Sequence, residues 1–472
     1  MAPGLPAPIK VTRVTDGEYT IDARIGSSHV CYKQDVQLVI DTGSGDFWVR
    51  PNKLPWLGDR KDWSKEHRID KVDRPTFIVT YGDKFFASSF VVEAEVRIGD
   101  IAGRQTLQVP RQVIGIAEVH GGNVETTPKF RQCGLLGLSL ETLRVLPYDA
   151  GPSLIQNSFL ATDEEGKELA NVLRAFTIKV PSDTDPNSLR GQGFMWLRSG
   201  PTQLATLREK YKSPLWYNGL MARPGLIRPE IPTDRQNGFW AFWSPTFYVG
   251  DEVIQHDDNV GIADTGTSQA LILPDVCKRL YEKIDPQYRK EENGKWYLKR
   301  DIPLDKIPEF GISVGKCPIW IAPDDIYDLA AAESSSDDWI EGTIQSRDSM
   351  VLEEDLLGAP FLKNCVAVHD MGSPPRFGVM QVPLPNGKTF WDFEVNRKFV
   401  DTNSNIITQL VRLQHAVWIN LPRGLSSMLT PPADSRVEIR PTTVEQGFIS
   451  KSDSELCYKS QIDIRFDGVH ES

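Results

Sequence analysis

Short segments of alternating apolar and polar residues, separated by turn residues, recur along most of the chain. Residues 18–22 and 35–40 show this alternation, and Gly26-Ser27-Ser28 lies between them. A period of two places successive side chains on opposite faces of a sheet, so the pattern predicts two strands joined by a turn. The chain is therefore expected to be mainly β.

Further segments extend the pattern. Residues 77–81 and 89–98 lie on either side of Gly82-Asp83, and this arrangement predicts a β-hairpin with its tip at those two residues. More strands are expected in the second half of the chain, at 238–243, 366–370 and 377–380. Residues 381–472 contain three short alternating runs, which predict a β-rich extension of unknown role.

Helices and loops are expected in fewer places. A helix is predicted over residues 163–175, where apolar residues recur at helical spacing. A shorter helix is predicted over 323–332, because Pro is well tolerated in a first turn. Residues 333–338 are polar and predict a solvated loop. Residues 181–193, rich in Pro, Ser, Asp and Gly, predict the crossover between the two halves of the chain.

Length and charge narrow the class of protein. A chain of 472 residues is too long for one ordinary core and predicts two or three domains. Its net charge of -11 gives no basic excess to neutralise phosphates, so a nucleic-acid partner is not expected. No apolar run reaches the length of a membrane span.

One motif occurs twice. Asp41-Thr42-Gly43-Ser44 follows the apolar run 37–40, and Asp264-Thr265-Gly266-Thr267 follows the apolar run 260–263. A carboxylate at the end of a buried strand is costly without a partner. Two such strands facing each other would set one Asp against the other, and the pair would share one proton because both cannot ionise at contact distance.

A second element repeats in register with the first. Leu135-Leu136-Gly137 ends 96 residues after Asp41 (41 to 137), and Leu356-Leu357-Gly358 ends 94 residues after Asp264 (264 to 358). Two unrelated turns would not explain these matched offsets. The chain is therefore expected to contain an internal duplication with a long period.

With these repeats, the chain resembles the pepsin-like aspartic proteases. The resemblance implies a bilobal, pepsin-like double β-barrel with the active site between its lobes. The expected domains are an N-terminal lobe (1–185), a C-terminal lobe (186–380) and the extension (381–472). An insertion is expected within 196–237, because the interval between Asp41 and Asp264 exceeds the separation usual in the family.

The resemblance also implies roles for the motif residues. Asp41 and Asp264 would be the catalytic pair, and Thr42 and Thr265 would cross-link the two loops. The remaining motif residues would supply hydrogen bonds to the two carboxylates: Gly43, Ser44, Gly266 and Thr267.

A flap is implied at the predicted hairpin. Tyr81, Gly82 and Asp83 would close over substrate and bind it as an additional strand, and Trp48 would meet Tyr81. Lys84-Phe85-Phe86 follows, where the family usually has a second Gly and a small residue. Ala359 and Cys133 also depart from positions where the family often has Asp. These differences indicate a divergent member.

The cysteines and the search for targeting signals bear on metal binding, disulfides and location. The six cysteines show no clustering typical of zinc sites. The position of Cys277 and Cys317 resembles that of a family disulfide, which implies a pairing between them. The family resemblance implies secretion or a vacuole, yet no signal peptide or N-glycosylation sequon is visible in this chain.

The leading hypothesis is an aspartic endopeptidase, a monomer without metal or cofactor that hydrolyses extended polypeptides. The alternative is a non-catalytic binding or inhibitor-like protein on the same fold, which loss of either Asp would favour. A β-rich binding protein with accidental Asp-Thr-Gly turns is a third reading, and it leaves the matched offsets unexplained. Serine, cysteine and zinc protease motifs are absent from the sequence.

Overall fold

A computed structural model describes the part of the chain on which the predicted site lies. The described residues are 8–14, 18–26, 34–50, 76–81, 86–99, 107–121, 134–146, 151–160, 174–182, 187–221, 238–292, 294–327, 338–349, 353–372, 374–390 and 392. The chain separates into two units, residues 1–397 and 398–472, and every described residue belongs to the first.

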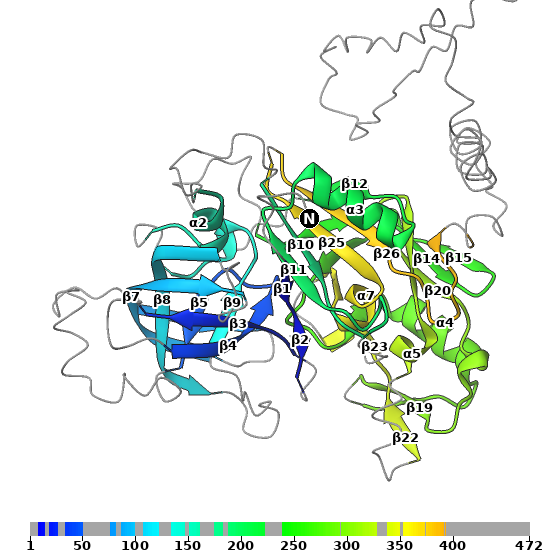
Figure 1. The fold of residues 1–472 in the computed structure, drawn as a ribbon. Helices are drawn as coiled ribbons and strands as arrows, with labels where there is room; N and C mark the ends of the chain where they lie inside the picture. Colours follow the sequence, from blue (N-terminus) through cyan, green and yellow to red (C-terminus); the bar gives the residue numbers. More distant parts are fainter. Residues whose placement is uncertain are drawn as a thin grey trace, which may run out of the picture. The chain divides into compact units, whose positions relative to one another are not determined.

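An eight-stranded sheet carries the first Asp motif (Figure 1, blue to cyan). In sheet order its strands are β2 (Thr12–Arg13), β3 (Tyr19–Ile25), β4 (Gln34–Asp41), β9 (Gly134–Gly137), β5 (Phe47–Val49), β8 (Leu107–Gly121), β7 (Phe86–Ile98) and β6 (Thr76–Thr80). β3 also pairs with β7, so the sheet folds back on itself. The alternating segments 18–22 and 35–40 thus form paired strands, as predicted.

A six-stranded sheet combines strands from both halves of the chain. In order these are β1 (Ile9–Lys10), β11 (Phe194–Leu197), β10 (Ala175–Lys179), β25 (Cys365–Asp370), β26 (Arg376–Gln381) and β12 (Trp216–Gly219). Figure 1 shows β10 beside β25. The predicted strands at 366–370 and 377–380 are confirmed as β25 and β26.

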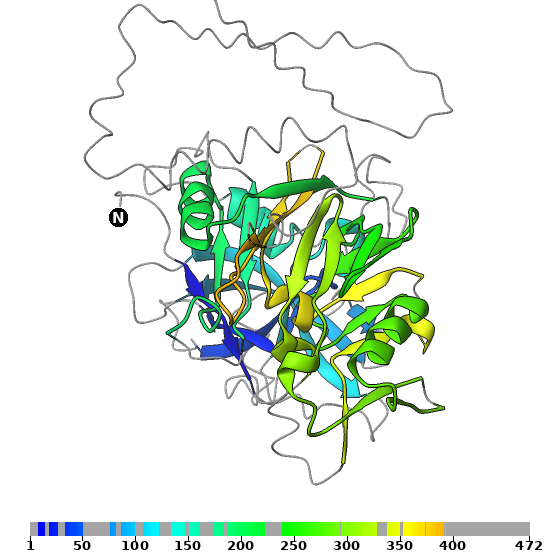
Figure 2. The same cartoon turned by 90° about the vertical axis from the view of Figure 1, so that its right-hand side faces the viewer.

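The second half of the chain adds three smaller sheets within the described residues (Figure 2). The five-stranded sheet carries the second Asp motif: β13 (Ala241–Trp243), β16 (Val260–Ala263), β24 (Asp355–Leu357), β17 (Ala270–Ile272) and β23 (Ile344–Ser346). The four-stranded sheet contains β15 (Glu252–Gln255), β14 (Thr246–Val249), β20 (Phe310–Val314) and β21 (Cys317–Ile321). The three-stranded sheet contains β18 (Arg289–Lys290), β19 (Trp296–Lys299) and β22 (Trp339–Glu341).

Helices are short and few among the described residues. The α-helices are α2 (Leu154–Leu160), α3 (Pro201–Tyr211), α4 (Pro274–Ile284), α5 (Pro323–Ile326) and α7 (Ala359–Leu362), and the 3₁₀ turns are η3 (Glu141–Leu143), η6 (Leu304–Lys306) and η7 (Arg347–Ser349). α3, α4 and α5 each have Pro in their first turn, where its missing N–H costs nothing. None of the described helices is long and apolar enough to cross a membrane.

The two repeats have the same local architecture. β4 lies parallel to β9, with Asp41 opposite Gly137, and β16 lies parallel to β24, with Ala263 opposite Leu357. In each case the strand that leads into Asp-Thr-Gly pairs with the Leu-Leu-Gly strand. The spacing of the motifs in the sequence therefore reflects a repeated pair of buried parallel strands.

Several predicted elements lie partly or wholly outside the described residues. Residues 163–173 of the predicted helix 163–175 lie outside the described residues. Its last residue, Ala175, begins strand β10 instead. The helix predicted from Pro323 begins there as α5, and residues 328–337 are not described. Residues 181–193, the predicted crossover between the two halves of the chain, lie between β10 and β11, which pair with each other in one sheet. Residues 393–472 of the predicted extension are not described, so the domain division stays a prediction.

The Cys277–Cys317 pairing implied by the family resemblance is wrong. Both thiols are buried and neither forms a disulfide, which also holds for Cys365. Cys277 Sγ, on α4, lies 4.0 Å from the Ile344 carbonyl, whereas Cys317 Sγ, on β21, lies 3.8 Å from the carbonyl of Pro318. The two thiols thus contact different strands.

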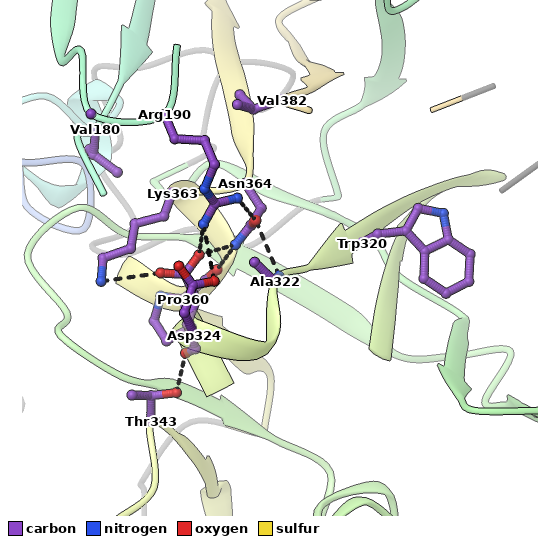
Figure 3. Close-up of polar contacts among 12 residues, drawn as sticks. Val180, Arg190, Trp320, Ala322, Asp324, Thr343, Pro360, Lys363, Asn364 and Val382 are labelled. Atoms are coloured by element: carbon purple, nitrogen blue, oxygen red, sulfur yellow. Dashed lines mark hydrogen bonds and ion pairs between the residues drawn. The ribbon is translucent and has the colours of Figure 1, made fainter. Parts of the chain in front are cut away.

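A buried polar cluster joins the loop after β10 to α5 and to the end of α7 (Figure 3). The Arg190 guanidinium donates to Asp325 Oδ2 at 2.6 Å and to Asn364 Oδ1 at 2.8 Å. Asn364 Nδ2 also donates to Asp325 Oδ2 at 2.7 Å, and Lys363 Nζ lies 3.3 Å from Asp325 Oδ1. Because the Asp325 carboxylate is buried, these donors replace the water it loses.

Candidate active site

Both motif carboxylates lie at the ends of buried strands and accept matched sets of hydrogen bonds. Asp41 Oδ1 accepts from the Gly43 N–H at 2.8 Å, and Asp41 Oδ2 accepts from the Ser44 hydroxyl at 2.5 Å. In the second motif, Asp264 Oδ1 accepts from the Gly266 N–H at 2.8 Å. The Thr267 hydroxyl donates to Asp264 Oδ2 at 2.6 Å. The repeat in sequence is thus a repeat in hydrogen-bond geometry.

Two threonines cross-link the motifs. The Thr42 hydroxyl donates to the Ala263 carbonyl at 2.9 Å and accepts from the Thr265 N–H at 3.0 Å. The Thr265 hydroxyl makes the reciprocal pair, donating to the Ile40 carbonyl at 2.8 Å and accepting from the Thr42 N–H at 3.0 Å. All four bonds are buried, where a lost partner is costly, so they fix the two loops against each other.

The glycines allow the two carboxylates to approach. A Cβ atom at Gly43 would lie 2.7 Å from Asp264 Cγ, and one at Gly266 would lie 2.6 Å from Asp41 Oδ1. Both contacts are closer than a real methyl group tolerates, and the atoms in the way belong to the carboxyl groups. Each Gly therefore leaves room for the Asp of the opposite motif.

Burial and the nearby Asp264 perturb the titration of Asp41. Asp41 and Asp264 are buried residues, 6% and 8% exposed. Burial raises the pKa of Asp41 well above its usual value, and the Asp264 charge raises that pKa further. The hydrogen bond from Ser44 acts in the opposite direction. Asp41 therefore retains its proton at a pH where an isolated carboxyl group would have lost it.

The Trp48–Tyr81 contact lies beside the first motif. The Trp48 indole N–H donates to the Tyr81 hydroxyl at 2.7 Å. Burial raises the pKa of Tyr81 well above its usual value, and the Asp41 charge contributes to that increase. β6 and β7 form the predicted hairpin, with Thr80 paired to Phe86. The expected tip residues Gly82 and Asp83 lie outside the described residues.

The sequence did not single out two further residues near the site. Asp46 is fully buried and accepts from the Val145 N–H at 2.9 Å and the Leu146 N–H at 2.8 Å, which holds the segment before Trp48. Trp240 is also fully buried and donates to the Leu138 carbonyl at 2.9 Å. Asp46 could have been noticed in the sequence, since it is a charged residue directly before the apolar run 47–49.

Metal ligation has no candidate in the described part of the chain. No group of three or more His, Cys, Asp or Glu side chains there could hold a metal ion. The paired motifs themselves present two buried carboxyl groups, each with fixed hydrogen-bond donors around it.

Comparison with known proteins decides the family. The family profile described as eukaryotic aspartyl protease matches residues 18–160 and 229–381, more than half of the chain. The chain belongs to this family. Each matched segment contains one Asp-Thr-Gly motif. Residues 161–228 are unmatched, and they overlap the segment 196–237 in which an insertion is expected.

Relatives within the family are distant. A protein of Aspergillus fumigatus, named as an aspergillopepsin A-like aspartic endopeptidase, is 27% identical over 72% of this chain and 71% of its own length. Aspergillopepsin-1 of Aspergillus pseudoglaucus is 24% identical over 77% of this chain and 78% of its own length.

A solved structure shares the fold. The aspartic proteinase from Irpex lacteus matches with a TM-score of 0.56 and 17% identity, over 80% of this chain and 97% of that one. This likeness confirms the predicted pepsin-like, mainly β fold.

Proposed function

We propose that the protein is an aspartic endopeptidase that hydrolyses internal peptide bonds of extended polypeptides through Asp41 and Asp264. Family membership supports a peptidase. The catalytic role of Asp41 and Asp264 rests on one observation, the pair of matched motifs. Thr42 and Thr265 cross-link these motifs, and the glycines of each motif leave room for the Asp of the other. Such fixed geometry costs no rearrangement during reaction, which favours catalysis over simple binding.

In the proposed reaction, the two carboxyl groups hold one proton between them. The ionised member removes a proton from a water molecule, whose oxygen attacks the carbonyl carbon of the peptide. The protonated member donates its proton to the carbonyl oxygen, which gives a neutral tetrahedral intermediate. The C–N bond then breaks as the newly protonated Asp gives its proton to the nitrogen. The other Asp takes a proton from a hydroxyl group of the intermediate, which leaves the carboxylic acid product and returns the pair to its starting state. Since the titration belongs to the pair, neither Asp is assigned as the acid.

The hydrogen bonds around the pair have a defined part in this scheme. The Gly43 and Gly266 N–H groups and the Ser44 and Thr267 hydroxyls hold the carboxyl oxygens in place. Tyr81, supported by Trp48, would lie on the flap side of the bound substrate. Gly82 and Asp83 would offer backbone hydrogen bonds to an extended peptide, as an added strand does.

A cleavage assay tests the proposal. We expect the wild type to cut an unfolded polypeptide at mildly acidic pH, with activity measured from about pH 3 to 7, and both Asp41→Asn and Asp264→Asn to be inactive. Asp22→Asn, an exposed carboxylate on β3, is the matched control and should retain wild-type activity. If the wild type binds a statine-type transition-state analogue without cleaving any polypeptide, the protein is instead a binding protein on the same fold.

Location and assembly are further parts of the proposal. The family resemblance favours a secreted or vacuolar protein that acts as a monomer. Fractionation of the producing cells tests the location, and light scattering of the purified protein tests the monomer. Recovery in the cytosol, or a mass twice that of the chain, would contradict these expectations.

A further inference from the structure

Trp240 occupies a position between the two Asp motifs. It is fully buried and immediately precedes β13, which pairs with β16 ahead of Asp264. Its indole N–H donates at 2.9 Å to the carbonyl of Leu138, which follows β9 beside the first motif. One side chain thus reaches from the strands of the second motif to those of the first.

This bond completes a closed circuit of hydrogen bonds around the two motifs. The Leu138 N–H donates to the Asp41 carbonyl at 2.7 Å, and the Ala263 N–H donates to the Trp240 carbonyl at 3.2 Å. The Thr42 hydroxyl donates to the Ala263 carbonyl at 2.9 Å. Because Thr42 follows Asp41 in the chain, the circuit returns to its starting point. The indole N–H and the Thr42 hydroxyl are the two side-chain donors in this circuit, and each joins one motif to the other.

Aromatic packing holds the indole ring in place. His369, on β25, contacts the ring edge-on with centroids 4.9 Å apart and planes at 78°. Phe176, on β10, lies 5.6 Å away at 81° and stacks on His369 at 4.4 Å. A ring packed edge-on against two neighbours cannot turn without displacing them, so the direction of the N–H is fixed.

We propose that Trp240 is a positioning residue for the carboxyl pair, because its indole N–H fixes the loop of Asp41 against the strand that carries Asp264. The inference rests on the proposed aspartic endopeptidase function. Trp240 contacts neither carboxyl group in the hydrogen bonds described, so its effect passes through Leu138 and the backbone of Asp41.

The first test separates catalysis from binding. Trp240→Phe keeps a buried ring and removes the N–H, and the Leu140 N–H still donates to the Gly238 carbonyl at 3.0 Å. Trp243→Phe is the matched control, since Trp243 donates to the Asp257 carbonyl at 2.6 Å from the other end of β13. We expect kcat to fall about tenfold or more in Trp240→Phe, with KM within about twofold of wild type. The control should keep both constants.

A second variant covers the case in which Trp240→Phe does not fold. Benzothienylalanine at position 240 replaces the indole N–H by sulfur in a ring of nearly the same shape. It should reproduce the loss of kcat while retaining the melting temperature to within about 3 °C. A wild-type kcat in this variant, or an equal loss in Trp243→Phe, would overturn the proposal.

The third measurement does not need activity. If Trp240 positions Asp41 against Asp264, Trp240→Phe should lower the melting temperature by a different amount once Asp41→Asn has replaced the carboxyl group that bonds to Asp264. We expect the two substitutions to be non-additive by at least about 2 °C near neutral pH. Additive shifts would overturn the inference. An inactive wild type that still shows this coupling would contradict the proposed function and leave the positioning role supported.

Discussion

Asp355 is a buried carboxyl group whose titration should set the stability of the fold between acidic and neutral pH. It lies on β24 opposite Gly261 and is fully buried. Its carboxylate accepts from Asn259 Nδ2 at 2.8 Å and from Arg347 Nη1 at 3.0 Å. Burial outweighs these two donors and raises the pKa of Asp355 to about 7.

The sign and size of the effect follow from this pKa. A carboxyl group whose pKa is about 7 in the folded chain and 3.8 when unfolded binds more protons in the folded state between those values. The free energy of unfolding therefore decreases as pH rises through that window. At 1.36 kcal/mol for each pH unit, the loss attributable to Asp355 is about 4 kcal/mol. Solvent does not screen this carboxyl group, because Asp355 has no exposed surface.

Urea denaturation at several pH values measures this loss. Asp355→Asn cannot titrate, so its free energy of unfolding should decrease by about 4 kcal/mol less than that of the parent between pH 4 and 7. Both proteins should carry Asp41→Asn, which removes cleavage and the titration of Asp41. Asp258→Asn, an exposed carboxylate nearby, is the control and should follow the parent. If the free energy of unfolding changed equally with pH in Asp355→Asn and its parent, Asp355 would not be the group that titrates.

Three further predictions concern other buried groups. Burial lowers the pKa of His369 to about 3 from 6.5, so wild type should lose about 5 kcal/mol of stability as pH falls through that window. His369→Phe should lose less, as urea midpoints at pH 4 and 7 will show, and equal losses would contradict the assignment. Arg190→Met leaves Asp325 with fewer donors and should reduce the free energy of unfolding by about 3–5 kcal/mol, measured by calorimetry; a loss below about 1 kcal/mol would contradict the cluster. Trp48→Phe removes the hydrogen bond to Tyr81 and should lower kcat/KM about tenfold in a peptide assay, whereas unchanged kinetics would exclude a role for that bond.

The strands around the two motifs could be predicted because their physics is local. Residues 37–40 and 260–263 are apolar runs that are each followed by a carboxylate, and each lies in a buried strand beside its Leu-Leu-Gly partner. The Thr42–Thr265 cross-link joins residues 223 positions apart. The repetition of the motif indicated this cross-link, which neither segment could have indicated alone.

Other features depend on tertiary packing and had no sequence signal. The link from Trp240 to Leu138 is an ordinary indole–carbonyl bond whose partner lies 102 residues away. Cys277 and Cys317 show the opposite case, in which the family resemblance implied a disulfide that the structure lacks, because the two thiols contact different strands. Ala175 has good helix propensity but begins β10, where pairing with Asp370 of β25 decides its conformation.

Whether Asp41 and Asp264 act as a shared pair is tested by comparing Asp41→Asn, Asp264→Asn and the double variant in one peptide cleavage assay. If the two carboxyl groups share a proton and act as one unit, each single substitution should reduce kcat to the same background as the double substitution. Substantial activity in either single variant, or losses that multiply in the double variant, would contradict the account of Asp41 and Asp264 as a shared catalytic pair.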